Sequence, residues 1–360
     1  MQTKVIFREE LSKLLFLNVK KEAIEDIFRI KINSDIDLPV RAVKVTENIN
    51  NGVELNNIPL NLFIEGMFFV LGSDENFLYN KEYKKLLNSF KNSTRIIKTI
   101  IFEELKKNNL LESYIMLTGL VNIEGNKDNY GKLLSLCNAL RIKNKDFQEE
   151  EISLISKLKN LPEYCNPYLY EAIINKENQD YQGALISLNK YLALGGEISE
   201  EIEELKSTLK FLSDYNLGIE LSISDPKKAL ELLLPLIEEG EETAIIYYHV
   251  AVAYRNLQNH EKAIYYLNVS MALDSALAEV VNELGINYAS LGDYASAVIY
   301  LRKAFEATKA IEICTNLVMC YLNLGNMEQA RLHLEIGKKI DVEDEMVKEL
   351  ERIMAGNISK

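Results

Sequence analysis

The second half of the chain repeats one hydrophobic pattern with a period of 33 to 34 residues. Within one unit, apolar side chains recur three and four positions apart, as at Tyr247, Val250, Ala251 and Tyr254, and this spacing is typical of an amphipathic helix. An alanine marks the same place in a second helix of each unit. These alanines are Ala229, Ala263, Ala297 and Ala330. A period of this length predicts an array of paired helices.

Short breaks separate the two helices of each unit. The breaks are residues 257–259, 291–293 and 324–326. Gly292 and Gly325 suit the positive φ that often ends a helix. Gly285 is expected where the paired helices approach each other most closely. Because one pair cannot bury its apolar stripe alone, consecutive pairs are expected to stack.

The segment from Val281 to Phe305, VNELGINYASLGDYASAVIYLRKAF, resembles the tetratricopeptide repeat family. Its hallmark positions are occupied by Leu284, Gly285, Tyr288, Gly292, Asp293, Tyr294, Ala297, Leu301 and Ala304. Val281 stands where the family often has Trp, and the chain has no Trp. Residues 244–343 match as three repeats. The resemblance implies an all-α fold, a right-handed α-solenoid of stacked helix-turn-helix units.

Sequence patterns divide the whole chain into four parts. Residues 1–95 are predicted to be mostly helical, 96–198 to be divergent helical repeats, 199–343 to be repeats, and 344–360 to be a capping helix. Within the first part, residues 7–30 have a helical pattern. Residues 38–58 partly alternate and end in a turn signal, Asn50-Asn51-Gly52, so a short β-hairpin or an irregular segment is predicted there. In the capping helix, one apolar stripe is expected to comprise Met346, Val347, Leu350 and Ile353.

Charge and hydropathy limit the class of partner. The formal net charge is −13, which argues against nucleic acid or an anionic membrane as a partner. The most apolar run, Leu60 to Gly72, is too short to span a bilayer and carries Glu65. The first residues, with acidic side chains by position 9, lack the apolar core of a secretory signal. We therefore expect a cytoplasmic protein.

The sequence shows no pattern of catalytic or metal-ligating residues. No pair among Cys137, Cys165, Cys314 and Cys320 has C-x-x-C spacing. The histidines His249, His260 and His333 have no partner residues at metal-ligand spacing. Common hydrolase and nucleotide-binding motifs are also absent from the sequence. We expect no cofactor, no metal and no enzymatic activity.

The resemblance implies a concave groove lined by the first helix of each repeat. Carried onto this chain, the candidate peptide-binding residues are Tyr248, Val252, Arg255, Asn282, Ile286, Thr315, Met319 and Leu322. Ile245, Glu279, Ala289 and Glu312 occupy the neighbouring groove positions. Exposed apolar groups among them would mark an interaction surface. Two alternatives are that these side chains contact neighbouring helices, or that a terminal segment of the chain fills the groove.

The residue types at these positions restrict the ligand. Some family members clamp an acidic carboxy-terminal peptide with Lys, Asn and Arg, whereas the corresponding positions here are Tyr248, Val252, Glu283, Glu312 and Asn316. The leading hypothesis is a non-enzymatic scaffold or adaptor that binds a helical or extended apolar segment of another protein. The alternative is a peptide-responsive bacterial regulator, a class that includes response-regulator phosphatases, with residues 1–100 as its effector domain.

Overall fold

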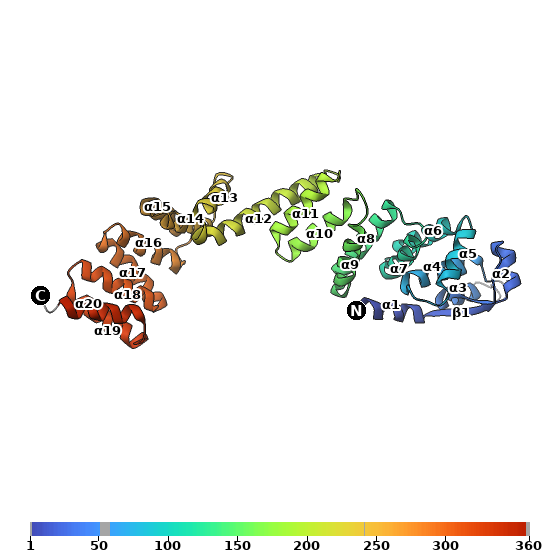
Figure 1. Cartoon of the computed structure of the whole chain (residues 1–360), viewed down its shortest axis with the longest axis horizontal. Helices are drawn as coiled ribbons and strands as arrows, with labels where there is room; N and C mark the ends of the chain where they lie inside the picture. The colour runs from blue at the N-terminus through green and yellow to red at the C-terminus, as the bar shows by residue number, and fades with distance from the viewer. Residues whose placement is uncertain (1, 51–57, 241, 358–360) are drawn as a thin grey trace. The chain divides into compact units, whose positions relative to one another are not determined.

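The computed structural model describes residues 2–50, 58–240 and 242–357 (Figure 1). The chain forms two compact units, Met1–Glu203 and Glu204–Lys360, each with its own hydrophobic clusters. Helices build both units, and in the described ranges the only strands are two of six residues each. The predicted all-α class, with a small β element near the N-terminus, is confirmed.

The β element lies earlier in the sequence than predicted. Helix α1 (Gln2–Ser12) is followed by strand β1 (Leu14–Val19), helix α2 (Lys21–Phe28) and strand β2 (Ile36–Arg41). The strands pair antiparallel, from Leu14 opposite Arg41 to Val19 opposite Ile36.

The helix expected throughout residues 7–30 is therefore wrong at 14–19. A short apolar run fits a strand as well as a helix, and here pairing with β2 decides between them. Helix α3 (Ala42–Asn50) follows β2 directly, and the rest of the predicted turn, Asn51 and Gly52, lies outside the described residues.

Two apolar helices, α4 (Leu60–Ser73) and α7 (Leu110–Val121), pack closely in the core of the first unit. A Cβ added to Gly119 of α7 would lie 2.0 Å from the Phe68 carbonyl oxygen of α4, and one added to Gly72 would lie 1.8 Å from the Ile115 oxygen. The two backbones are thus in direct contact. The apolar run from Leu60 is a buried core helix, and no helix in the described part of the chain is long and apolar enough to cross a membrane. The helices that complete this unit are α4 (Leu60–Ser73), α5 (Asn80–Ser89), α6 (Ser93–Lys106), α7 (Leu110–Val121), α8 (Lys127–Lys143), the 3-10 helix η2 (Lys145–Phe147), α9 (Gln148–Leu158), α10 (Asn166–Glu177) and α11 (Tyr181–Ala193).

The second unit is a series of helix pairs. Its helices are α12 (Glu200–Ser224, which begins in the first unit), α13 (Pro226–Glu238), α14 (Ala244–Asn256), α15 (His260–Leu273), α16 (Ala278–Ser290), α17 (Tyr294–Thr308), α18 (Ile311–Asn323), α19 (Met327–Ile340) and α20 (Glu345–Asn357). The three predicted breaks are confirmed. Gln258, Gly292 and Gly325 have φ of 59°, 80° and 71°. The next residue in each break caps the second helix, as Asp293 does by accepting from the Ser296 N–H.

Small residues bring the paired helices together, as predicted. A Cβ added to Gly285 of α16 would lie 2.5 Å from Leu301 Cγ of α17, and one added to Gly218 of α12 would lie 2.6 Å from Leu233 of α13. Ala297 is fully buried in the same contact layer. The repeat period thus places its small residues at the helix-pair contacts.

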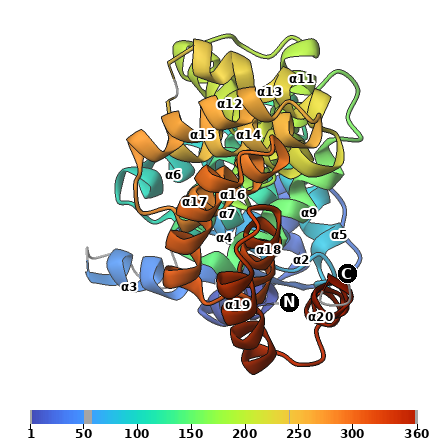
Figure 2. The ribbon, with the colours of Figure 1, turned by 90° about the vertical axis from the view of Figure 1, so that its left-hand side faces the viewer.

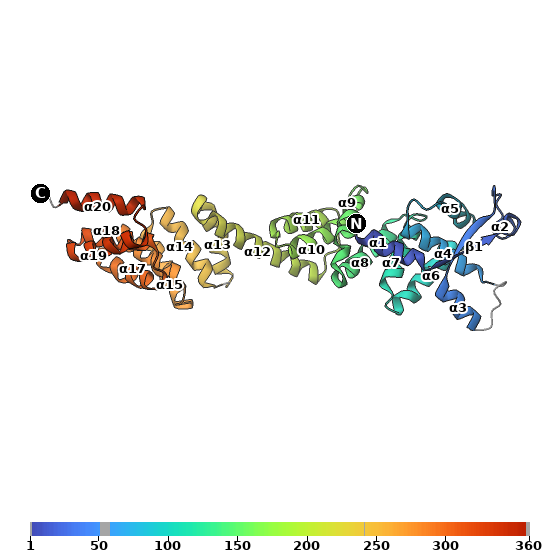
Figure 3. The same cartoon turned by 90° about the horizontal axis from the view of Figure 1, so that it is seen from below.

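Helix α20 packs on α18 and α19 (Figure 3). Val347, Leu350 and Met354 are buried in this contact, whereas Met346 is 51% exposed and Ile353 38% exposed. The apolar stripe predicted for this helix is therefore wrong by two residues. It follows the spacing 347, 350 and 354, which keeps three side chains on one face.

Candidate functional site

The first helices of the repeats, α14, α16 and α18, are neighbours in the second unit. Each pairs with a second helix, and Figure 2 shows α15, α17 and α19 on one side of this row. We call the predicted groove positions on the first helices the inner face. It comprises Ile245, Tyr248, Val252 and Arg255 on α14, then Glu279, Asn282, Ile286 and Ala289 on α16, and Glu312, Thr315, Met319 and Leu322 on α18.

The inner face combines exposed and covered side chains. Ile245 is 45% exposed and Met319 41% exposed, and Glu279 and Glu312 are also exposed. The half-buried positions are Tyr248, Arg255, Asn282, Ile286, Ala289 and Leu322. Apolar groups that solvent reaches are therefore present on all three first helices.

Two predicted groove residues are not accessible. Val252 is 3% exposed and Thr315 6% exposed, in contrast to the exposure expected from the repeat position. Each first helix has a first helix of the adjacent repeat beside it. Val252 and Thr315 are therefore packing residues of the repeat array rather than exposed groove residues.

A polar cluster bridges α14 and α16. Arg255 Nη1 lies 3.2 Å from Glu283 Oε1. Arg255 Nε and Glu283 Oε2 are buried and lack a hydrogen-bond partner in the described residues, and the same holds for Oδ1 of Asn282, the residue before Glu283. Burial raises the pKa of the Glu283 carboxyl, and the Arg255 charge lowers it in part. Burial, together with the charges of Glu283 and Glu279, raises the pKa of Tyr248. The cluster is thus compact and incompletely hydrogen-bonded.

Polar links that were not predicted from the sequence also join successive first helices. His249 Nδ1 lies 3.1 Å from Ser222 Oγ, and the Asn256 side chain donates to the Ser222 carbonyl. Burial lowers the pKa of His249, which favours a neutral ring in a structural role. A signal was present in the repeat columns, because His249, Glu283 and Asn316 occupy one position in three repeats. A polar residue kept at one place in an apolar helix indicates a shared polar contact.

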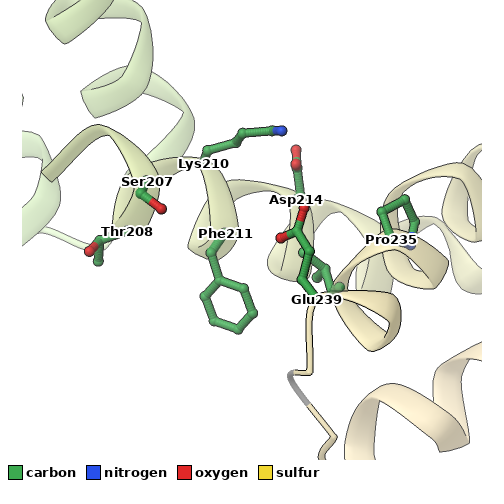
Figure 4. A pocket seen from close by; sticks show the side chains of 8 residues that line it. Ser207, Thr208, Lys210, Phe211, Asp214, Pro235 and Glu239 are labelled. Atoms are coloured by element: carbon green, nitrogen blue, oxygen red, sulfur yellow. The ribbon is translucent and has the colours of Figure 1, made fainter. Parts of the chain in front are cut away.

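A second concavity lies between α12 and α13, with a volume of about 380 Å³. Figure 4 shows the Lys210 and Asp214 side chains pointing toward one another at its wall. Burial and the nearby Glu239 raise the pKa of Asp214, and Lys210 lowers it. No group of three or more His, Cys, Asp or Glu residues suited to a metal ion occurs in the described ranges. This concavity contains none of the predicted site residues.

Comparisons with known proteins agree with the repeat assignment. The tetratricopeptide repeat family model matches residues 244–276, 278–310 and 311–335, so the chain carries three tetratricopeptide repeats. No curated protein sequence matches the chain.

Similar solved structures include YrrB, a tetratricopeptide-repeat protein with an unusual peptide-binding site, at 18% identity and a TM-score of 0.41, covering 55% of this chain and 97% of YrrB. MamA is 19% identical with a TM-score of 0.38, and the match covers 50% of this chain and 92% of MamA. TTC0263 of Thermus thermophilus is 19% identical with a TM-score of 0.31, and the match covers 54% of this chain and 98% of TTC0263.

Proposed function

We propose that this tetratricopeptide-repeat chain is a non-enzymatic, cytoplasmic scaffold that binds an apolar peptide segment of another protein on its inner face. The observation that supports the proposal most directly is the exposure of apolar side chains on adjacent first helices. Ile245 and Met319 are more than two-fifths exposed, and Ile286 and Leu322 are half-buried. Exposed apolar groups in a row favour an interaction surface.

Helix α20 packs at the end of the repeat array. Helix α20 contacts both helices of the last pair, α18 and α19, and buries Val347 and Leu350 there. A helix that packs on both members of a pair covers the end of the array rather than the row of first helices. This placement favours a partner from outside the chain. In the described part of the chain, no specific observation favours the peptide-responsive regulator or a phosphatase.

A double substitution on the inner face tests this proposal. The full-length protein is panned against a phage-displayed library of random peptides, and the enriched peptides are synthesised and titrated by fluorescence anisotropy. Ile286→Glu with Met319→Glu is expected to weaken binding at least tenfold, about 1.4 kcal/mol, because it places carboxylates beneath an apolar ligand. The unfolding free energy is expected to change by only about 0.5 kcal/mol per site, since both side chains are partly exposed.

The matched control makes the same chemical change on the second helices. Ile299 is 57% exposed on α17 and Leu332 is 52% exposed on α19, so Ile299→Glu with Leu332→Glu adds the same charge away from the inner face. The control is expected to bind like the unchanged protein. Equal loss in both variants, or loss in neither, would place the ligand elsewhere. Failure of any peptide to enrich would argue against a peptide-binding scaffold.

A further inference from the structure

The inner face carries more negative than positive charge. Glu279 and Glu312 contribute two carboxylates, the adjacent Glu283 a third, and Arg255 one guanidinium, which gives a formal balance of −2. Arg255 is already paired with Glu283. Neither Glu279 nor Glu312 forms an ion pair with a described residue, and both are exposed. A cationic ligand would therefore be attracted to this surface, and an anionic one repelled.

Glu283 provides an independent reason to expect a cationic group. The residue is 7% exposed, and its Oε2 has no hydrogen-bond donor in the described part of the chain. Oδ1 of the adjacent Asn282 is also buried and unpaired. Both atoms are acceptors, and buried acceptors without donors are unfavourable. A group with N–H donors, such as the side chain of Lys or Arg, would satisfy Glu283 Oε2.

Tyr248 and Arg255 favour arginine over lysine. Tyr248 packs beside this cluster, and its pKa is raised in part by the charges of Glu283 and Glu279. A planar guanidinium can stack on an aromatic ring while it donates to a carboxylate, which an ammonium cannot do equally well. The unpaired Arg255 Nε needs an acceptor, and a backbone carbonyl of the same ligand can supply it. An arginine within a peptide thus carries both the donors that Glu283 Oε2 lacks and a carbonyl acceptor for Arg255 Nε.

We infer that Glu279, Asn282 and Glu283, with the ring of Tyr248, form a subsite for an arginine side chain of the bound peptide. This inference rests on the proposed function, and it specifies the chemistry of the partner: an apolar segment with one arginine among its apolar residues. Glu283 Oε2 is covered in the free chain. Entry of the guanidinium therefore requires side chains around Glu283 to move.

Synthetic peptides that differ at one position test the subsite. A library of about 10 residues, long enough to cross the three first helices, has acetylated and amidated ends and flanks drawn from Leu, Ile, Ala and Ser. Its central residue is Arg, Lys, citrulline or Glu. Citrulline preserves the shape of arginine without its charge. Full-length protein is expected to bind the tightest arginine peptides at least tenfold better than their citrulline counterparts, and the glutamate peptides most weakly.

Substitutions of the protein then assign the preference to the subsite. Glu283→Gln is expected to reduce the arginine-to-citrulline ratio to below about threefold, with little change for citrulline peptides. If Glu283→Gln does not fold, Glu279→Gln with Glu312→Gln replaces it, because both carboxylates are exposed, and it too is expected to lower the ratio. Glu306→Gln, an exposed change on α17, is the control and keeps the full ratio.

The outcomes separate this inference from the function on which it rests. Peptides bound equally with arginine and citrulline would overturn the subsite and leave the scaffold proposal intact. A preference for arginine that survives in both the Glu283→Gln and the Glu279→Gln, Glu312→Gln proteins would also overturn it. Binding of no peptide by the folded protein would refute both.

Discussion

Helices approach each other closely in both units, but the atoms in contact differ. In the first unit, a Cβ on Gly119 would lie 2.0 Å from the Phe68 carbonyl oxygen, so two backbones touch. In the second unit, a Cβ on Gly285 would lie 2.5 Å from the Leu301 side chain. A side chain can change rotamer, whereas the carbonyl of a packed helix moves only with the helix. The α4–α7 contact is therefore expected to tolerate less change than the α16–α17 contact.

The hydrophobic clusters around the two contacts increase this difference in tolerance. Helices α4 and α7 belong to one continuous core that extends from Phe7 to Phe147. The repeats instead form successive smaller clusters, as expected where each repeat contacts only its neighbours. A displaced helix in the first unit disturbs the whole core, while a displaced helix in the second disturbs the adjacent pairs.

The largest expected effect is that of Gly119→Ala. Alanine would gain up to about 1 kcal/mol of helix propensity, but its Cβ would clash with the Phe68 backbone. No flexible side chain is involved that could move aside. Overpacking costs about 1–3 kcal/mol, and occasionally more, and this site is expected at or above that upper limit. Chemical denaturation measures the loss. Hydrogen exchange is expected to show faster exchange throughout residues 58–158 and unchanged exchange in α14–α19.

The matched change Gly285→Ala is the control for this comparison. Its Cβ meets the flexible end of Leu301, so the gain in helix propensity offsets most of the clash and the net change is expected to be about 1 kcal/mol or less. Equal destabilisation by the two alanines would contradict the distinction between backbone and side-chain contacts.

A leucine at Gly285 is expected to have the second-largest effect. Leu301 can yield to one methyl group, but a full isobutyl group exceeds the space between α16 and α17, and overpacking of about 1–3 kcal/mol is expected. Faster hydrogen exchange should be limited to α14–α19. An unchanged denaturation midpoint would show that the register assigned to this repeat is wrong.

The two units also differ in how far sequence alone predicted them. The columns that contain Ala263, Ala297 and Ala330 predicted the helix pairs and their breaks, because the same packing contacts recur in each repeat. The first unit has no repeat columns of comparable regularity. Strand β1 depends on pairing with residues about 20 positions away, and Gly72 and Gly119 stand at the α4–α7 contact with no periodic signal. Contacts between segments distant in sequence determine both strand β1 and the α4–α7 contact.

The same reasoning explains what was predictable at the inner face. Family resemblance placed its positions on the first helices, and the structure shows Ile286 and Met319 partly exposed. The burial of Val252 and Thr315 arises from tertiary packing, which the pattern of a single helix does not contain. Glu283 shares a polar column with His249 and Asn316, but Ala289 and Leu322 occupy the column of Arg255, so the repeats did not indicate the Arg255–Glu283 pair.

The smallest expected effect is a pH dependence of stability that compares one buried carboxyl in each unit. Burial raises the pKa of Glu65 in the first unit and of Glu283 in the second, although Arg41 and Arg255 respectively lower it in part. The folded chain then holds these protons more tightly than the unfolded chain, where the pKa is near 4.5. The stabilising contribution is complete below that value and is lost as the pH rises through the folded pKa.

Glu65→Gln and Glu283→Gln remove one titrating group each. The unfolding free energy of the unchanged protein, relative to either variant, is therefore expected to fall from acidic pH to neutrality. Denaturant titrations at several pH values measure this difference. If this difference rose with pH for Glu283→Gln, the attraction of Arg255 would outweigh the effect of burial on Glu283. The two units would then differ in which effect dominates at the buried carboxyl.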